Sequence, residues 1–271
     1  MATHTAQPPT APDPSSQPGL YDDPVVYDIL HAPGTALEVN GLERLAIEQL
    51  DTGPRTQTWL EPACGTARHL RLAAKRGYHA AGFDRSPTMI EDATRRARRA
   101  GIADRCRFFV ADMTDFEIAP RSVDLALNLI NTIRHLATDD DLLAHLDLVA
   151  DALRPAGAYA VGLSTTAYGL EPPSEDVWTT ARGSRRITQV VQYEPPAEGD
   201  RNERVVSHVT STTPSHEAHA TSTYWLRTYS LDQWLDALDR SALAPAGTFD
   251  ESGRPIPPAE IGYRVWLLTL R

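Results

Sequence analysis

The chain has 271 residues, which allows one large domain or two small ones. A hydrophobic fraction of 41% and a charged fraction of 23% exclude a wholly disordered chain. The net charge of −10 argues against a nucleic-acid partner, and two cysteines, Cys64 and Cys106, exclude a disulfide framework. No apolar run is long enough to span a membrane and no Cys/His spacing is typical of a metal site, so we expect a cytoplasmic protein without a membrane partner.

The N-terminal region divides into two segments. Residues 1–19 are rich in Pro, Ser and Thr and lack the basic start and apolar segment of a signal peptide, which predicts a disordered leader. Residues 20–57 contain two predicted helices. One follows Pro24, and the other covers residues 36–50 with Gly41 interrupting it.

The middle of the chain alternates between predicted strands and helices. The strands are expected at residues 58–61, 79–84, 107–111, 123–130 and 157–163, and the helices at 66–76, 87–100 and from 138 onward. Ser86 and Pro87 form an N-cap and first-turn pair, and Gly77 and Gly101 suit helix ends. Strands that alternate with helices over short connections predict a parallel sheet covered on both faces.

The pattern changes after Ser164. Segments rich in Thr, Val and Tyr at 185–194, 203–213 and 217–228 predict an antiparallel meander, followed by a helix at 230–240 and strands at 243–249 and 262–270. We therefore predict an α/β fold with a doubly wound, mostly parallel seven-stranded sheet. Its core would comprise residues 58–164 and 230–271, with an antiparallel insert at 165–229.

Three residues mark a candidate ligand site, because ligands of open parallel sheets bind beyond the carboxyl ends of the strands. Gly65 follows the first strand, where it would let a backbone approach a ligand closely. Asp84 ends the second strand and could accept both hydroxyls of a ribose, and Asp112 ends the third. Each alone has an ordinary interpretation, as a turn, a helix cap or a solvated acid. Their placement on three successive strand ends predicts a nucleotide cofactor.

Four motifs carry a resemblance to the class I S-adenosylmethionine-dependent methyltransferases. They are Glu61-Pro62-Ala63-Cys64-Gly65-Thr66-Ala67, the segment from Gly82 to Ile90, Val110-Ala111-Asp112-Met113, and the segment from Val123 to Asn131. The resemblance covers about residues 20–165. The sequence departs from the family pattern at Ala67, where a third glycine is usual.

The resemblance implies S-adenosylmethionine as cofactor and S-adenosylhomocysteine as product, within a Rossmann-like methyltransferase fold. It implies that residues 20–57 cover the cofactor and that the insert forms a substrate lid. The implied cofactor-binding residues are Tyr21, Tyr27, Glu61, Ala63, Gly65, Asp84, Arg85, Met89, Asp112, Met113 and Asn128. Cys64 is expected to pack rather than react.

The acceptor is expected after the fourth strand, beside Asn131 and His135. His135 could take a proton from the acceptor or could be a structural histidine, and both interpretations stay open. Six side chains of the insert region are candidates for contact with substrate, namely Trp178, Arg182, Tyr193, Trp225, Arg227 and Tyr229. The predicted reaction is methyl transfer to oxygen or nitrogen of a small molecule, mainly by in-line positioning.

Two other functions are alternatives to this prediction. A nicotinamide-dependent oxidoreductase needs a Gly-x-Gly-x-x-Gly turn, and here Ala67 and Leu70 stand at the second and third glycine positions. A regulatory protein that binds the cofactor, or an enzyme that uses it for another step, remains open, as does the oligomeric state, a homodimer being one option. Four arginines between Pro87 and Gly101 are expected to form a solvated face: Arg95, Arg96, Arg98 and Arg99.

Overall fold

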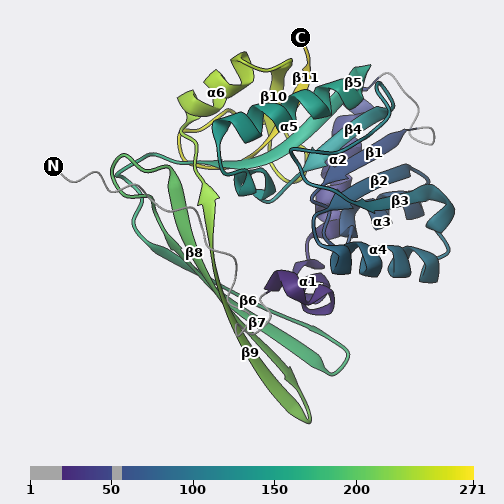
Figure 1. Ribbon diagram of the computed structural model, residues 1–271, viewed down its shortest axis with the longest axis vertical. Coiled ribbons are helices and arrows are strands. Elements are labelled where there is room, and N and C mark those ends of the chain that lie inside the picture. Colours follow the sequence, from purple (N-terminus) through teal and green to yellow (C-terminus); the bar gives the residue numbers. More distant parts are fainter. Residues whose placement is uncertain (1–19, 51–56) are drawn as a thin grey trace.

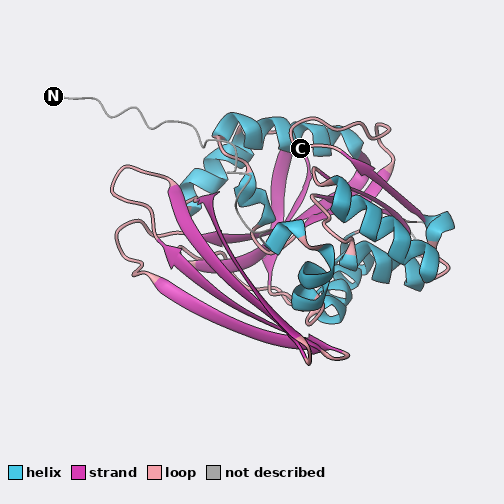
Figure 2. Ribbon diagram, turned by 60° about the horizontal axis from the view of Figure 1, so that its bottom comes forward, coloured by secondary structure: helices cyan, strands magenta, loops and turns pink. Residues whose placement is uncertain are grey.

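The computed structural model describes residues 20–50 and 57–271, so the leader predicted for residues 1–19 lies outside the described residues. The described chain forms a helix-covered sheet and a second, antiparallel sheet that projects from it (Figure 1). Figure 2 shows the helices packed around the first sheet and the long strands of the second standing apart. This arrangement confirms the predicted α/β class with an antiparallel insert.

The first sheet has seven strands in the order β10-β11-β5-β4-β1-β2-β3. Their bounds are β1 Thr58–Pro62, β2 His79–Asp84, β3 Cys106–Val110, β4 Val123–Asn128, β5 Leu153–Thr165, β10 Leu243–Phe249 and β11 Gly262–Leu270. All neighbours pair in parallel except β11, which runs antiparallel to both β5 and β10. The strand order reverses beside β1, so a crevice opens at the carboxyl ends of β1 and β4.

Helices cover both faces of this sheet because each contributes an apolar stripe to one of two cores. On one face lie α2 Thr35–Gln49, α3 Arg68–Arg76 and α4 Pro87–Arg99, packed against side chains such as Trp59 and Leu125. On the other lie α5 Asp139–Ala152 and α6 Leu231–Asp239, packed against Phe83 and Trp266. Short 3-10 helices complete the core, η3 at Ala103–Arg105 and η4 at Thr132–His135.

The insert is a four-stranded sheet in the order β6-β7-β8-β9, one strand more than predicted. Its strands are β6 Ser174–Arg182, β7 Arg185–Glu194, β8 Asn202–Thr213 and β9 His216–Arg227. The unpredicted strand is β6, an edge strand whose residues are nearly all exposed. It therefore lacks the alternation of apolar and polar residues by which a half-buried strand is recognised.

Two short elements precede the core, η1 Leu20–Asp22 and α1 Pro24–His31. The side chain of Asp23 caps α1 by accepting the backbone N–H groups of Val25 and Val26. The predicted interruption of the next helix at Gly41 is wrong, because α2 continues through it. A methyl group at Gly41 would lie 2.4 Å from the carbonyl oxygen of Glu251, so this glycine serves close packing against the loop after β10.

Several predicted boundaries also shift, for local backbone reasons. Helix α3 begins at Arg68 rather than residue 66, because Ala67 takes a left-handed conformation with φ of 55° as its N-cap. Strand β4 ends at Asn128 rather than residue 130, because Ile130 and Asn131 have positive φ values. Strand β5 begins at Leu153, ahead of a register shift, rather than at residue 157. Among the described helices, none is long and apolar enough to cross a membrane.

Candidate active site

A pocket of about 210 Å³ lies at the carboxyl ends of β1, β2, β3 and β4, beneath η1 and α1. The predicted site residues that line it are Tyr21, Tyr27, Glu61, Ala63, Gly65, Asp84, Arg85, Met89, Asp112, Met113 and His135. The structure thus brings together all the predicted site residues except Asn128 and Asn131.

The turn after β1 is held against the end of β2 by Asp84. The Asp84 carboxylate accepts the N–H of Gly65 at 2.8 Å through Oδ2 and the N–H of Ser86 at 2.9 Å through Oδ1. Burial raises the pKa of Asp84, and these two N–H groups act against that rise. Gly65 has a φ of 53°, and a methyl group there would lie 2.9 Å from the Tyr27 ring, so this position requires glycine. The acid therefore fixes the loop and also faces the pocket.

Glu61 supplies a buried carboxylate oxygen without a partner. Its Oε1 lies 2.6 Å from Nδ1 of His69, whereas its Oε2 has no hydrogen-bond partner among the described residues. The other ring nitrogen of His69 lies 3.0 Å from Glu38, which also pairs with Arg68. Burial would lower the pKa of His69, but Glu61 and Glu38 raise it, so the imidazolium holds Glu61 in place. A buried carboxylate oxygen without a partner at a pocket wall fits a cationic ligand group.

The same network makes stability depend on pH. Burial would raise the pKa of Glu38, but hydrogen bonds from His69 and Arg68 lower it from 4.5 to about 2. A carboxyl with a depressed folded-state pKa stabilises the fold above the unfolded-state pKa, and that stabilisation is lost as the pH falls through the folded-state pKa. We therefore expect the free energy of unfolding to fall more steeply between pH 4.5 and pH 2 in the parent than in Glu38→Gln. Parallel slopes in urea titrations across that range would refute this assignment.

The third strand-end acid, Asp112, stands beside apolar walls. Its Oδ1 accepts the N–H and the hydroxyl of Thr114 at 2.9 and 2.8 Å. Burial would raise the pKa of Asp112, but these two hydrogen bonds lower it. Met89 and Met113, both buried, line the pocket nearby. An ionised acid beside two polarizable apolar side chains suits a flat heterocycle with an exocyclic amine.

The opposite end of the pocket is aromatic. The Tyr21 ring lies 6.0 Å from Tyr27, 5.8 Å from His135 and 5.7 Å from Tyr224 of β9. Tyr21 and Tyr224 also share a side-chain hydrogen bond, and Tyr193 of β7 is near enough to act on both electrostatically. Rings from η1, η4 and the insert sheet thus meet at one place, where the pocket borders the predicted lid.

His135 is neutral at physiological pH. His135 lines the pocket, where desolvation by the surrounding protein atoms and the charges of Arg85 and Arg134 lower its pKa to about 4. A histidine with so low a pKa carries a free lone pair at pH 7 but binds a proton weakly.

Asn128 and Asn131 lie outside the pocket lining and make structural contacts. Asn128 is buried and donates to the carbonyl of Pro62 at 3.1 Å. Asn131 donates to the hydroxyl of Ser164 at 3.0 Å and accepts the Ser164 backbone N–H at 2.6 Å. These contacts tie the loop after β4 to β1 and β5.

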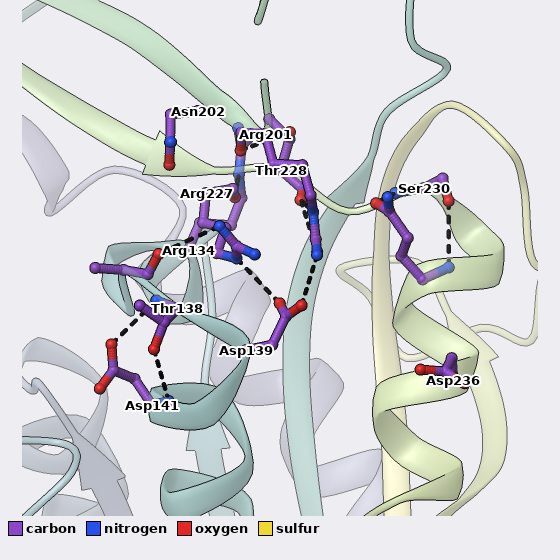
Figure 3. Close-up of polar contacts among 12 residues, drawn as sticks. Arg134, Thr138, Asp139, Asp141, Arg201, Asn202, Arg227, Thr228, Ser230 and Asp236 are labelled. Carbon is purple, nitrogen blue, oxygen red and sulfur yellow. Dashed lines mark hydrogen bonds and ion pairs between the residues drawn. The ribbon is translucent and has the colours of Figure 1, made fainter. Parts of the chain in front are cut away.

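The insert is anchored to the core beside η4. Asp139 at the start of α5 pairs with Arg201 at 2.6 Å and with Arg227 at 3.0 Å, as Figure 3 shows. Arg134 donates to the carbonyl of Arg227 at 2.9 Å and pairs with Glu203 at 2.7 Å. Because Arg134 precedes His135, this anchor sets the position of His135 relative to the insert.

The sequence did not predict several residues that line the pocket, notably His31, Arg68 and His69. Arg68 and His69 open α3 and are buried, so a polar pair on the buried face of that helix was the available signal. Of the six insert-region candidates, Tyr193 borders the aromatic end, whereas Arg227 is an anchor and Tyr229 is buried in the core. Trp178 and Trp225 are exposed, and Arg182 contacts α1 instead.

Comparison with known proteins identifies the domain. Residues 60–157 match the family model described as a methyltransferase domain. This segment contains all four motifs in full, together with Glu61, Asp84 and Asp112.

Solved structures of similar fold extend the comparison over nearly the whole chain. The sugar N-methyltransferase KedS8 from Streptoalloteichus is 20% identical with a TM-score of 0.69, over 97% of this chain and 98% of that one. DesVI from Streptomyces venezuelae is 17% identical with a TM-score of 0.73, over 91% and 96%. CalS10 from Micromonospora echinaspora, a SAM-bound amino pentose methyltransferase, is 16% identical with a TM-score of 0.69, over 91% and 95%.

Residues 60–157 therefore match a methyltransferase domain, and the described chain shares the fold of solved S-adenosylmethionine-dependent methyltransferases. The pocket fits that cofactor by its own chemistry. The unpaired Oε2 of Glu61 suits the ammonium of the methionine part, Asp84 suits the ribose diol, and Asp112 suits the adenine amine.

Proposed function

We propose that this methyltransferase transfers the methyl group of S-adenosylmethionine to the amino nitrogen of a sugar-like small molecule. The cofactor supplies a methyl group already activated by a sulfonium. The observation that carries the choice of nitrogen is the aromatic end of the pocket, where His135 is too weak a base to ionise a hydroxyl efficiently. A neutral amine attacks through its own lone pair and needs no ionisation. The similarity in fold to a sugar N-methyltransferase and an amino pentose methyltransferase supports the same class of acceptor.

The proposed division of labour follows from the pocket lining and from the ring contacts of Tyr21 at its aromatic end. Glu61, Asp84 and Asp112 hold the polar groups of the cofactor, and Met89 and Met113 provide its apolar walls. Tyr21, Tyr224 and His135 surround the acceptor amine. Methylation of an amine yields a cation, which tyrosine faces attract by roughly 0.5–2 kcal/mol each, so these rings favour the transition state as positive charge develops.

A matched-pair assay tests the proposal. Small sugars that differ only in an amino or hydroxyl group at one carbon would be incubated with enzyme and S-adenosylmethionine, and S-adenosylhomocysteine would be quantified. We expect turnover with amino members only, and mass spectrometry should locate the new methyl group on nitrogen. Turnover of the hydroxyl members alone would overturn the choice of nitrogen. Cofactor binding without turnover of either set would favour a regulatory protein.

His135 is expected to position the acceptor rather than remove its proton. His135→Ala should lower kcat by about tenfold, below the 10²–10⁴-fold typical of a well-matched general base, and leave the affinity for S-adenosylhomocysteine unchanged. His135→Asn, which keeps a hydrogen-bonding group but cannot titrate, should retain most of the activity. The rise of kcat/KM with pH should follow the pKa of the acceptor amine in all three proteins. A displaced pH midpoint in either variant would indicate that His135 is the base.

A further inference from the structure

The insert sheet β6–β9 is called the lid sheet here, and the hairpin between β6 and β7 is its tip. We propose that Asp28 and Arg182 are positioning residues that link this tip to the cofactor pocket through α1. This inference rests on the proposed function only for the identity of the cofactor and is independent of the acceptor. Neither residue lines the pocket, so any effect on cofactor binding must act through other residues.

Asp28 is the meeting point of four elements. It is 2% exposed, and its Oδ1 accepts the hydroxyl of Thr66 at 2.9 Å and pairs with Arg71 of α3. Its Oδ2 pairs with Arg96 of α4 at 2.8 Å and with Arg182 of β6 at 2.7 Å. Arg96 thus leaves the solvated face predicted for it, while Arg98 and Arg99 are exposed as expected. Burial would raise the pKa of Asp28, but Arg71, Arg182 and Arg96 lower it, so the group is an anion.

Arg182 connects this centre to the lid. It is the last residue of β6, beside the hairpin that leads into β7, and its second guanidinium nitrogen donates to the backbone carbonyl of Asp28 at 3.1 Å. One arginine therefore holds both the side chain and the backbone of the same α1 residue. In Figure 1, α1 lies between the strands of the lid sheet and α4.

The remaining side chains of α1 face two ways. Tyr27 lies against Gly65 in the cofactor loop and lines the pocket. Val26, Ile29 and Leu30 are buried against Ile187 of β7 and Val209 of β8. Asp28 sits within the same two turns as both contacts. A rigid helix that touches the cofactor loop on one side and the lid on the other transmits displacement between them.

Such a link is reciprocal in free energy. If holding the lid tip against α1 favours cofactor binding, then the bound cofactor must favour the held lid tip by the same factor. The lid sheet also contributes Tyr224 and Tyr193 to the acceptor end. A cofactor-loaded pocket would thereby present a better-ordered acceptor site.

The test compares Arg182→Gln with Arg186→Gln in the full chain. Arg186 lies on the same hairpin, is exposed, has no ion pair among the described residues, and points to the sheet face opposite Ile187. Arg182→Gln should weaken S-adenosylhomocysteine binding about two- to fivefold, as expected for a half-exposed ion pair, while Arg186→Gln binds as the parent does. Hydrogen exchange at residues 180–187 should slow on adding S-adenosylhomocysteine in the parent and in Arg186→Gln. It should slow much less in Arg182→Gln.

Equal affinity and equal ligand-dependent protection in Arg182→Gln and Arg186→Gln would overturn the inference. Asp28→Asn and the double variant Asp28→Asn/Arg182→Gln complete a cycle in which the two effects should be less than additive. If Asp28→Asn does not fold, the comparison of Arg182→Gln with Arg186→Gln is sufficient to test the inference. Failure of the parent to bind S-adenosylhomocysteine would instead refute the cofactor assignment, so the two failures are distinguishable.

Discussion

Asp84→Ala is expected to weaken binding of S-adenosylhomocysteine about 10- to 100-fold and binding of 5′-methylthioadenosine by a similar factor. The second ligand shares the nucleoside but lacks the amino-acid part. Hydrogen bonds to a charged group are worth about 1.5–3 kcal/mol, and the ribose diol that Asp84 would accept is present in both ligands. Asp84 also holds the N–H groups of Gly65 and Ser86, so its loss should loosen the loop against which the nucleoside is proposed to bind.

Calorimetric titration of both ligands would measure this effect. Asp104→Ala is a suitable control, because Asp104 is exposed in η3, away from the pocket. The control should bind both ligands as the parent does. A folded Asp84→Ala protein with parental affinities would show that the ribose is held elsewhere.

The strand-end acids were predictable because they depend on local signals. Once apolar runs and capping residues such as Ser86 and Thr138 mark where strands and helices end, the rule for parallel sheets brings Gly65, Asp84 and Asp112 to one edge, whereas Glu61 was implied by the family resemblance. The structure does place all three in one pocket. Even Ala67, which departs from the family pattern, keeps a left-handed backbone that glycine would adopt more easily.

Residues that depend on tertiary pairing could not be predicted in this way. His69 and Glu38 are 31 positions apart, and Arg182 and Asp28 are 154 apart, so no local pattern relates them. Arg96 lies in a run of arginines that the sequence predicts to be solvated, and its ion pair with buried Asp28 depends on the tertiary structure. The role of Gly41 likewise depends on a carbonyl of Glu251 far along the chain.

Glu61→Gln is expected to weaken binding of the amino-acid part of the cofactor and to leave binding of its nucleoside part almost unchanged. S-adenosylhomocysteine should bind about 10- to 100-fold more weakly, because the amide removes a charged acceptor from the ligand ammonium. Binding of 5′-methylthioadenosine should stay within about twofold of the parent, since that ligand has no ammonium and a twofold change is only about 0.4 kcal/mol. The Oε2 of Glu61 motivates this expectation, because Glu61 is 6% exposed and that oxygen has no partner among the described residues.

The contrast between ligands distinguishes direct contact from a loosened loop. If Glu61 acted only by supporting the turn at Gly65 through His69, both ligands would lose affinity together, as they should in Asp84→Ala. Retained binding of 5′-methylthioadenosine also shows that the variant is folded, and Glu117→Gln, an exposed acid outside the pocket, controls for the change of net charge. Equal losses for the two ligands would therefore leave Glu61 as a support for the loop. The ammonium would then be held by another acceptor.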